Sequence, residues 1–203
     1  AGNYLGSCAG DAGPDLVDGV TSQNSEKNMK VSDALTKRKS TRAFLAKEVS
    51  REQIVRILDA AKHAPSGVNT QPWQVAVVTG EKKREIQEKV LAEFRARGKG
   101  EMDYRYYPLV WREPYKSRRF ACGIQLYGAL GIKRQEKERR LEQWTANYRA
   151  FDAPVMLFFF MDSGLEAGSF MDYGMFLQSV MLAAVEEGLA TCAQAALGQY
   201  PAL

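Results

Sequence analysis

Residues 38–73 read RKSTRAFLAKEVSREQIVRILDAAKHAPSGVNTQPW, and this stretch decides how the chain begins to fold. In its middle, Ser50 and Gln53 have the spacing of a capping box, in which two side chains satisfy free amides at the start of a helix. Apolar residues then recur at helical spacing from Ile54 to Ala61. The stretch therefore predicts an amphipathic helix with a polar cluster on either side of it.

The first polar cluster is RKSTR at 38–42, which gathers three cations and two hydroxyls at the end of an expected helix over 31–38. Charge-assisted donors that converge in this way suit a phosphate group. In an extended chain Arg38, Ser40 and Arg42 point to one side, because alternate residues share a face. The alternative interpretation is a solvated basic turn, since charged residues are mostly exposed.

The second polar cluster is APSGVNTQPW at 64–73, between the expected helix and an expected strand. Small residues let the backbone approach a flat ligand closely, and Ser66, Asn69 and Gln71 offer hydrogen-bond donors and acceptors. The alternative interpretation is a simple helix stop, in which Trp73 belongs to the core.

The remaining pattern predicts helices around a few buried strands. Strands are expected over 73–79 and 153–161, the second apolar enough for burial on both faces. Further helices are expected over 81–97, 120–130, 133–148 and 170–187, and an extended segment over 189–194. This alternation predicts an α+β or three-layer α/β domain.

Residues 1–28 hold five glycines and only scattered apolar side chains, and we expect them to form a flexible N-terminal extension. They lack the basic start and continuous apolar run of a signal peptide. Residues 29–203 are the predicted folded domain, and Ser32 is the expected N-cap of its first helix.

Composition argues against several function classes. A net charge of +4 is too small to indicate nucleic-acid binding, and no apolar run reaches the roughly 20 residues of a membrane span. The single histidine, His63, argues against Ser-His-Asp chemistry. Cys8, Cys122 and Cys192 form no Cys-x-x-Cys pair, so no metal site is expected, and their odd number and wide spacing favour a reducing compartment.

Two segments have an unusual composition. Residues 151–203 carry six acidic and no basic side chains, whereas 81–150 carry 18 basic and 10 acidic ones. The C-terminal quarter therefore reads as core that the basic middle segment wraps. Residues 98–119 place five aromatic rings and two prolines among six cations without a regular period. We expect an ordered excursion over the domain there.

Together these segments resemble the nitroreductase family of FMN-dependent enzymes. The family opens on Arg-x-Ser-x-Arg-x-Phe, here 38–44, and continues through a helix to Ala-Pro-Ser-x-x-Asn-x-Gln-Pro-Trp, here 64–73. The YYP, W, EPY and RR residues within 106–119 are similar to the subgroup that contains nitrobenzoate-type reductases, and LATCAQ at 189–194 matches the family again. The resemblance extends over about 29–203.

The resemblance implies a nitroreductase-like fold: α+β, of the three-layer α/β sandwich type, with helices around a mostly antiparallel central sheet. It also implies a further C-terminal portion that supplies another strand, embraces the partner subunit and brings a basic group to the FMN phosphate. The sequence stops at Leu203. We therefore expect a truncated chain that lacks the last strand, with consequences for FMN affinity and for the dimer.

The resemblance also implies where FMN binds. Arg38 and Ser40 correspond to residues at the phosphate and ribityl chain, and Arg42 to a cation beside the ring. Residues of 65–71 correspond to a loop from the other subunit, and the backbone of 192–195 to the edge of the ring that carries N5. The implied cofactor-binding residues are Arg38, Lys39, Ser40, Arg42, Pro65, Ser66, Gly67, Asn69, Gln71, Cys192, Ala193, Gln194 and Ala195.

The implied substrate-binding residues are Tyr107, Trp111 and Tyr115 in the aromatic segment. They are placed to line a pocket for a small aromatic acceptor. The alternative is that these rings pack on the surface of a helix pair.

The implied activity is that of a cytoplasmic, homodimeric, FMN-dependent oxidoreductase that uses NADH or NADPH to reduce nitroaromatic or quinone-type acceptors by ping-pong hydride transfer. Because the flavin carries the chemistry, no catalytic side chain and no metal are expected. The expected partners are a second subunit that shares the active sites and the acceptor, with no nucleic acid and no membrane. Two alternatives stay open: a related flavin enzyme for reductive dehalogenation or flavin breakdown, and a flavin-free remnant that acts as a binding module.

Overall fold

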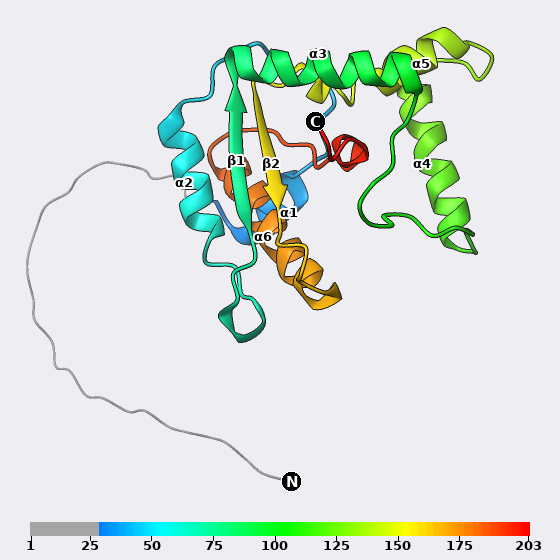
Figure 1. Cartoon of the computed structure of the whole chain (residues 1–203). Helices are drawn as coiled ribbons and strands as arrows, with labels where there is room; N and C mark the ends of the chain where they lie inside the picture. Colours follow the sequence, from blue (N-terminus) through cyan, green and yellow to red (C-terminus); the bar gives the residue numbers. More distant parts are fainter. Residues whose placement is uncertain (1–28) are drawn as a thin grey trace, which may run out of the picture.

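The computed structural model describes residues 29–203, so the predicted extension over 1–28 lies outside the described residues. The chain forms an α+β arrangement in which helices surround one small sheet (Figure 1). The helices are α1 (Val31–Lys37), α2 (Arg51–Ala61), α3 (Gly80–Arg97), α4 (Tyr115–Ala129), α5 (Lys137–Thr145) and α6 (Ala167–Glu186). The strands are β1 (Gln74–Thr79) and β2 (Val155–Phe160), and short 3-10 turns cover η1 (Gly67–Asn69), η2 (Ala150–Asp152) and η3 (Ala196–Gln199).

The sheet consists of β1 and β2, which run antiparallel with Gln74 opposite Phe160 and Thr79 opposite Val155. The expected α+β class with an antiparallel sheet is confirmed. In the described part of the chain each strand has one hydrogen-bonded neighbour. The prediction that the second strand is buried on both faces is only partly confirmed, because Met156 is buried while Phe160 is 54% exposed.

Helix α6 forms the core by packing against α2 and against one face of the sheet (Figure 1). Phe176 of α6 is 2% exposed, and its ring stacks on Trp73 with 4.7 Å between centroids. The interpretation of Trp73 as a core residue is therefore confirmed. The buried members of this cluster are Ile57, Ala61, Tyr173, Phe176, Val180 and Ala184.

Tyr173 ties α6 to the end of the sheet. Its hydroxyl lies 3.1 Å from the carbonyl oxygen of Gln74 and 2.9 Å from that of Phe160, which are opposite each other at the ends of the strands. Burial raises the pKa of Tyr173 to about 12, so the hydroxyl remains a donor at neutral pH. The loop that precedes β1 is thereby held at the N-terminal half of α6.

The two predicted helix starts had different outcomes. The capping box of α2 is confirmed: the Gln53 amide donates to Ser50 Oγ over 3.2 Å, and the Ser50 amide donates to Gln53 Oε1 over 3.2 Å. The prediction of Ser32 as N-cap is wrong, because Lys30 occupies that position without a side-chain hydrogen bond. Helix α1 begins at Val31, which places Ser32 inside its first turn.

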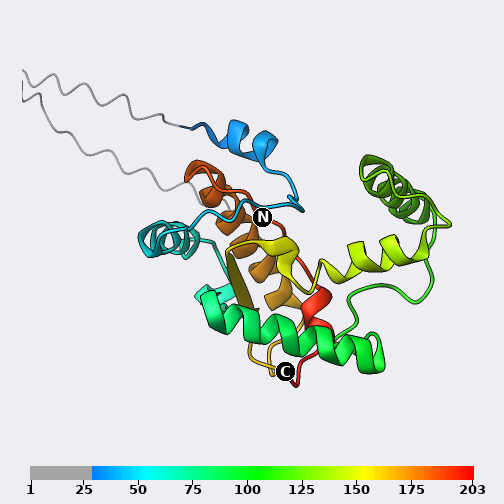
Figure 2. The same cartoon turned by 90° about the horizontal axis from the view of Figure 1, so that it is seen from above.

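The middle of the chain projects from this core. Figure 2 shows α4 and α5 extending away from the sheet, and no residue of α4 is buried. Helix α4 begins earlier than the predicted 120–130, whereas α5 is shorter than the predicted 133–148. The start of α5 is delayed because the Lys133 amide donates to Glu136 Oε2 over 2.6 Å and closes a turn before it.

We predict that Phe176→Ala lowers the free energy of unfolding by about 3–5 kcal/mol, because it opens a cavity between Trp73 and Tyr173. Urea unfolding at fixed protein concentration measures this. The control is Leu141→Ala on the exposed side of α5, which should cost less than about 1 kcal/mol. Equal losses for the two variants would contradict the assignment of Phe176 to the core.

Candidate functional site

Two segments that are far apart in the sequence pair at the first polar cluster. Ser40 and Thr191 form an isolated parallel bridge, and the Thr41 amide donates to the Thr191 carbonyl oxygen over 3.0 Å. This pairing brings RKSTR at 38–42 beside the segment 189–195 that follows α6. The extended segment expected over 189–194 is therefore reduced to one bridge, but two segments predicted to bind the same ligand lie together.

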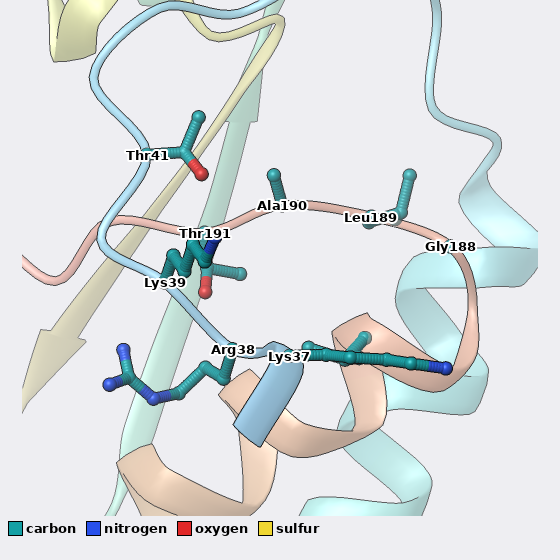
Figure 3. Close-up of a pocket in the computed structure, with 9 residues that line it drawn as sticks. Lys37, Arg38, Lys39, Thr41, Gly188, Leu189, Ala190 and Thr191 are labelled. Atoms are coloured by element: carbon teal, nitrogen blue, oxygen red, sulfur yellow. The ribbon is translucent and has the colours of Figure 1, made fainter. Parts of the chain in front are cut away.

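A pocket of about 310 Å³ opens beside this pairing (Figure 3). Figure 3 shows the side chains of Lys37 and Arg38 extending in opposite directions from the chain. The residues that line the pocket are Lys37, Arg38, Lys39, Thr41, Val185, Gly188, Leu189, Ala190 and Thr191. Of this set, only Arg38 and Lys39 are among the predicted cofactor-binding residues, whereas Thr41 and 189–191 lie within the motifs that carry the resemblance. The predicted residues Ser40, Arg42 and 192–195 do not line this pocket.

The Thr191 hydroxyl is a buried polar atom without a hydrogen-bond partner, and no other side-chain atom of the described chain is in that position. Buried polar groups are nearly always paired, so each exception needs an explanation. Thr191 lines the pocket together with Lys37, Arg38 and Lys39, of which the first two extend in opposite directions (Figure 3). The positive charge around the pocket fits a polar, negatively charged ligand.

On the same pairing, Arg42 and Cys192 are neighbours. An Arg42 Nη donates to the Ser40 carbonyl oxygen over 3.2 Å, and the guanidinium carbon lies 5.9 Å from the centre of the Phe151 ring. Burial raises the pKa of the Cys192 thiol, and the positive charge of Arg42 opposes that rise. The Phe151 ring and the half-buried Cys192 thiol therefore both lie near the Arg42 side chain.

The segment that follows Cys192 is anchored from the other side. Gln194 Nε2 donates to the carbonyl oxygen of Asn147 over 3.1 Å and lies 3.2 Å from its Oδ1. This contact fixes the backbone of the predicted residues Ala193 and Ala195, which flank Gln194. The contact ties the segment 192–195 to the turn that follows α5.

Arg56 and Glu187 hold the turn from α6 into this segment. They form a bidentate ion pair, with both Arg56 nitrogen to Glu187 oxygen distances at 2.7 Å. Gln53 Nε2 also reaches the Glu187 carbonyl oxygen over 3.5 Å. Donation from Arg56 lowers the pKa of Glu187 below its usual value. Helix α2 therefore positions the residue immediately before Gly188 of the pocket.

The second polar cluster forms a tight loop on the other end of α6. The Gln71 amide donates to Ser66 Oγ over 2.9 Å, and Gln71 Nε2 donates to Asn69 Oδ1 over 2.9 Å. The Gly67 amide donates to Asp172 Oδ2 of α6 over 3.2 Å. Pro65, at the start of the loop, is exposed. These three hydrogen bonds hold the loop in one conformation, and its tip is exposed.

The structure does not bring the two polar clusters together within the described chain. The loop contacts Asp172 near the start of α6, whereas the pocket contacts Val185 near its end. Thirteen residues of helix separate these contacts, or about 20 Å at 1.5 Å per residue. The two segments that the resemblance assigns to one ligand therefore lie at opposite ends of α6.

The aromatic residues predicted to bind substrate lie on the projecting part. Tyr107 and Trp111 are in contact, with ring centroids 5.6 Å apart, and Tyr115 opens α4. Tyr107 and Tyr115 are each 60% exposed, so they are not satisfied core residues. Tyr104 of the same segment contacts Phe170 of α6, with ring centroids 5.4 Å apart.

Between residues 29 and 203, no group of His, Cys, Asp or Glu is arranged to hold a metal ion. None of the helices in that range is both long enough and apolar enough to cross a membrane.

The chain is thus an α+β domain with a pocket lined by cations beside the Ser40–Thr191 bridge. Residues 35–200 match the Nitroreductase family, and the chain belongs to that family. It is 43% identical over 165 residues to a nitrobenzene nitroreductase of Ectopseudomonas oleovorans, covering 81% of this chain and 73% of that protein. It is 37% identical over 176 residues to a 4-nitrobenzoate reductase of a Nocardioides species, covering 84% and 71%.

Among solved structures, the FMN and NADPH-dependent nitroreductase NfnB of Sphigopyxis sp. strain HMH superimposes with a TM-score of 0.82. The identity is 44%, over 85% of this chain and 78% of that one. The resemblance inferred from the sequence motifs is confirmed.

We predict that Glu187→Gln makes the free energy of unfolding depend less steeply on pH in the acid range. The pKa of Glu187 is lowered by folding, so its contribution is present above the unfolded pKa and is lost as pH falls through the folded one. Between about pH 5 and pH 3 the free energy of unfolding should fall less steeply in the variant than in the wild type. Urea titrations across this range measure the slopes.

The matched control is Glu138→Gln on α5, whose exposed carboxylate takes part in none of the ion pairs of the described residues. It should keep the wild-type slope. Parallel curves for the wild type and Glu187→Gln would contradict a positioning role for the Arg56–Glu187 pair.

Proposed function

We propose that this chain binds FMN and uses NADH or NADPH to reduce nitroaromatic or quinone-type acceptors. One observation carries the proposal: the Ser40–Thr191 pairing joins the two segments predicted from the sequence to bind FMN within a protomer. The relatives described above support it, because they are nitroreductases and the solved one is named as FMN- and NADPH-dependent.

The groups at the pairing fit FMN. The cations of Arg38 and Lys39 and the unpaired Thr191 hydroxyl suit a phosphate and a polyol chain. Arg42 would place positive charge beside the ring, and the anchored backbone of 192–195 would lie along the ring edge. Ser40 would bind with Arg38, as the motif implies.

FMN, when bound, supplies the hydride chemistry. The chain's own residues therefore need to bind and orient, and no nucleophile or base is required of them. The Arg56–Glu187 pair and the Gln194–Asn147 contact hold the segment 188–195 from both sides, which favours a fixed ligand position. Residues 29–203 act together as the FMN-binding domain in this proposal.

We propose further that the active protein is a homodimer with shared sites. The loop residues Pro65, Ser66, Gly67, Asn69 and Gln71 lie about 20 Å along α6 from the half-site of the same protomer, which we define as the groups at the Ser40–Thr191 pairing. In a two-fold dimer the loop of one subunit can complete the half-site of the other. Exposed apolar side chains on α4 and α6 supply surface for such an interface: Phe120, Ile124, Phe170, Met171 and Met175.

Tyr107, Trp111 and Tyr115 are proposed to contact the acceptor. The exposure of Tyr107 and Tyr115 in the described chain supports this, because a ring already buried in the core has no face to offer a ligand. We also place the protein in the cytoplasm. NADH and NADPH are cytoplasmic reductants, and Cys122 and Cys192 are free thiols, as expected in a reducing compartment.

The first test is an absorption spectrum of the purified full chain with FMN, before and after anaerobic NADPH. We expect a flavin spectrum that NADPH bleaches and that nitrobenzene restores. Bleaching without reoxidation by nitroaromatics, but with reoxidation by a halogenated phenol, would favour the dehalogenating alternative. A chain that takes up no FMN would contradict the proposal in favour of a flavin-free binding module.

We predict that Arg38→Ala weakens FMN binding about ten-fold or more, because a charge-assisted contact to the phosphate is lost. Fluorescence titration of FMN measures the dissociation constant. Arg84→Ala on α3 removes an exposed cation that does not line the pocket and should bind like the wild type. An unchanged constant in Arg38→Ala would show that the half-site is misassigned.

We predict that two inactive variants complement each other when their subunits are mixed. Arg38→Ala damages the half-site, and Asn69→Gly removes the loop side chain while it keeps the positive φ of 58° accessible. After co-refolding, shared sites would restore about a quarter of the wild-type nitroreductase activity. A mixture of the Arg38→Ala and Ser40→Ala variants should stay inactive, because both substitutions damage the same half-site. Equal failure of both mixtures would contradict shared sites.

A further inference from the structure

The turn between α5 and β2 has a backbone conformation that its residues adopt only at a cost. Ala150, Phe151 and Asp152 of η2 have φ values of 53°, 51° and 62°, in the left-handed region that favours glycine. This turn contains no glycine, and Phe151 is 4% exposed. Such a conformation persists only where surrounding contacts enforce it, and it is concentrated at functional sites.

Hydrogen bonds hold this turn from two sides. The Arg149 carbonyl oxygen accepts from Gln87 Nε2 of α3 over 2.5 Å. The Asn147 carbonyl oxygen accepts from Gln194 Nε2 over 3.1 Å. The turn is thus fixed between α3 and the segment 192–195, which the resemblance assigns to FMN.

The Phe151 side chain is not explained by packing among other apolar residues. It belongs to neither of the two clusters of buried apolar residues within 29–203, one around Phe176 and the other around Tyr148. The aromatic pairs formed in the same range do not include its ring. The ring faces Arg42 instead, with 5.9 Å between its centre and the guanidinium carbon, within the range of a cation–π contact.

Arg42 has few contacts that fix its position. Its side chain is exposed, and none of the ion pairs formed by residues 29–203 includes it. One Nη donates to the Ser40 carbonyl oxygen over 3.2 Å. Because a long exposed side chain samples many rotamers, each contact that restricts it makes the position of its charge more definite. Phe151 is therefore well placed to hold this charge beside the Ser40–Thr191 bridge.

We infer that Phe151 is a positioning residue that holds the Arg42 guanidinium in place beside the FMN ring. The inference rests on the proposed function, in which Arg42 lies beside that ring, and it adds a residue that the sequence motifs did not name. A fixed positive charge there stabilises the negative charge that flavin gains on reduction, so Phe151 acts on the reduction potential through Arg42. A glycine would adopt the left-handed turn at less cost, but it would supply no ring for the guanidinium.

The first test needs no FMN, because the Cys192 thiol reports where the Arg42 charge lies. Burial raises the pKa of this thiol, and the Arg42 charge lowers it. In the full chain with Cys8→Ser and Cys122→Ser, the pH profile of alkylation by iodoacetamide gives the pKa of Cys192. We expect Phe151→Leu to raise that pKa, so that alkylation at pH 8 slows about two- to five-fold, and Arg42→Gln to slow it at least as much.

Three comparisons separate positioning from packing. In the Arg42→Gln background, Phe151→Leu should cause no further change in the thiol pKa, since the two residues act through one contact. Phe151→Met also removes the ring but has a different shape, and it should shift the thiol pKa in the same direction as Phe151→Leu. The control Phe94→Leu removes a ring that contacts Tyr148 and should keep the wild-type pKa.

The second test uses the full chain loaded with FMN. Its two-electron midpoint potential, from an anaerobic titration against a reference dye, should be more negative in Phe151→Leu than in the wild type. A loss of about two- to ten-fold in the affinity for reduced relative to oxidised FMN corresponds to about 9–30 mV for a two-electron couple. Phe94→Leu should keep the wild-type potential.

Three results would overturn the inference. An unchanged thiol pKa in both Phe151 variants, while Arg42→Gln raises it, means that Phe151 does not hold the guanidinium. Equal shifts with and without Arg42 assign Phe151 to the packing of the segment 192–195. An unchanged potential in a Phe151 variant whose thiol has responded means that Arg42 does not lie beside the FMN ring.

Failure of the proposed function has a different signature. A chain whose thiol responds as expected but which takes up no FMN contradicts the proposed function and the role of Phe151 toward FMN. The contact between Phe151 and Arg42 would then stand on the thiol measurement alone.

Discussion

The burial of helix α6 is the constraint on which the rest of the structure depends. Phe176 and Tyr173 fix it to the sheet through a ring stack and a pair of carbonyl contacts, and Ile57 and Ala61 of α2 close its other side. A helix so held is a rigid spacer. The loop before β1 is bound at one end of it, and the segment that pairs with Ser40 leaves from the other. The separation of the two polar clusters is therefore a property of the core.

The uneven charge of the chain follows from the same packing. Residues 151–203 lack Lys and Arg because β2 and α6 lie in the core, where a cation costs free energy unless it is paired. Glu187, directly after α6, is mostly buried and is paired with Arg56 of α2. The basic middle segment forms α3, α4 and α5 around the outside, and many of its charges remain exposed.

Local patterns predicted local structure well. The capping box of Ser50 and Gln53, the strand before Gly80 and the cations of 38–42 all depend on residues a few positions apart, and the structure contains them. The wrong prediction of Ser32 as N-cap is also a local matter. The N-cap lies two residues earlier, at Lys30, and no side chain caps this helix.

The site was predictable only as separate pieces. That Thr191 lies against Ser40 and that Asp172 holds Gly67 are long-range facts set by the burial of α6. The family motif named Arg38, Ser40 and Arg42 without these contacts. It could not identify the Thr191 hydroxyl, because a single Thr in an apolar segment carries no signal of its own until its neighbours are known.

Backbone strain is concentrated near the two segments proposed to bind FMN. In the described chain, the non-glycine residues with positive φ form two short runs, Val68, Asn69 and Gln71 in the loop and 150–152 in η2. Left-handed conformations are costly for a β-branched or bulky residue, at about 1–3 kcal/mol each. Phe151 of the second run supplies the ring that faces Arg42, and Val68 of the first is fully exposed. Strain is retained only where surrounding contacts enforce it, here the Asp172–Gly67 and Ser66–Gln71 hydrogen bonds. A loop that is strained, held by these hydrogen bonds and exposed at its tip is suited to a contact outside its own chain, which supports the proposal that a second subunit completes the site.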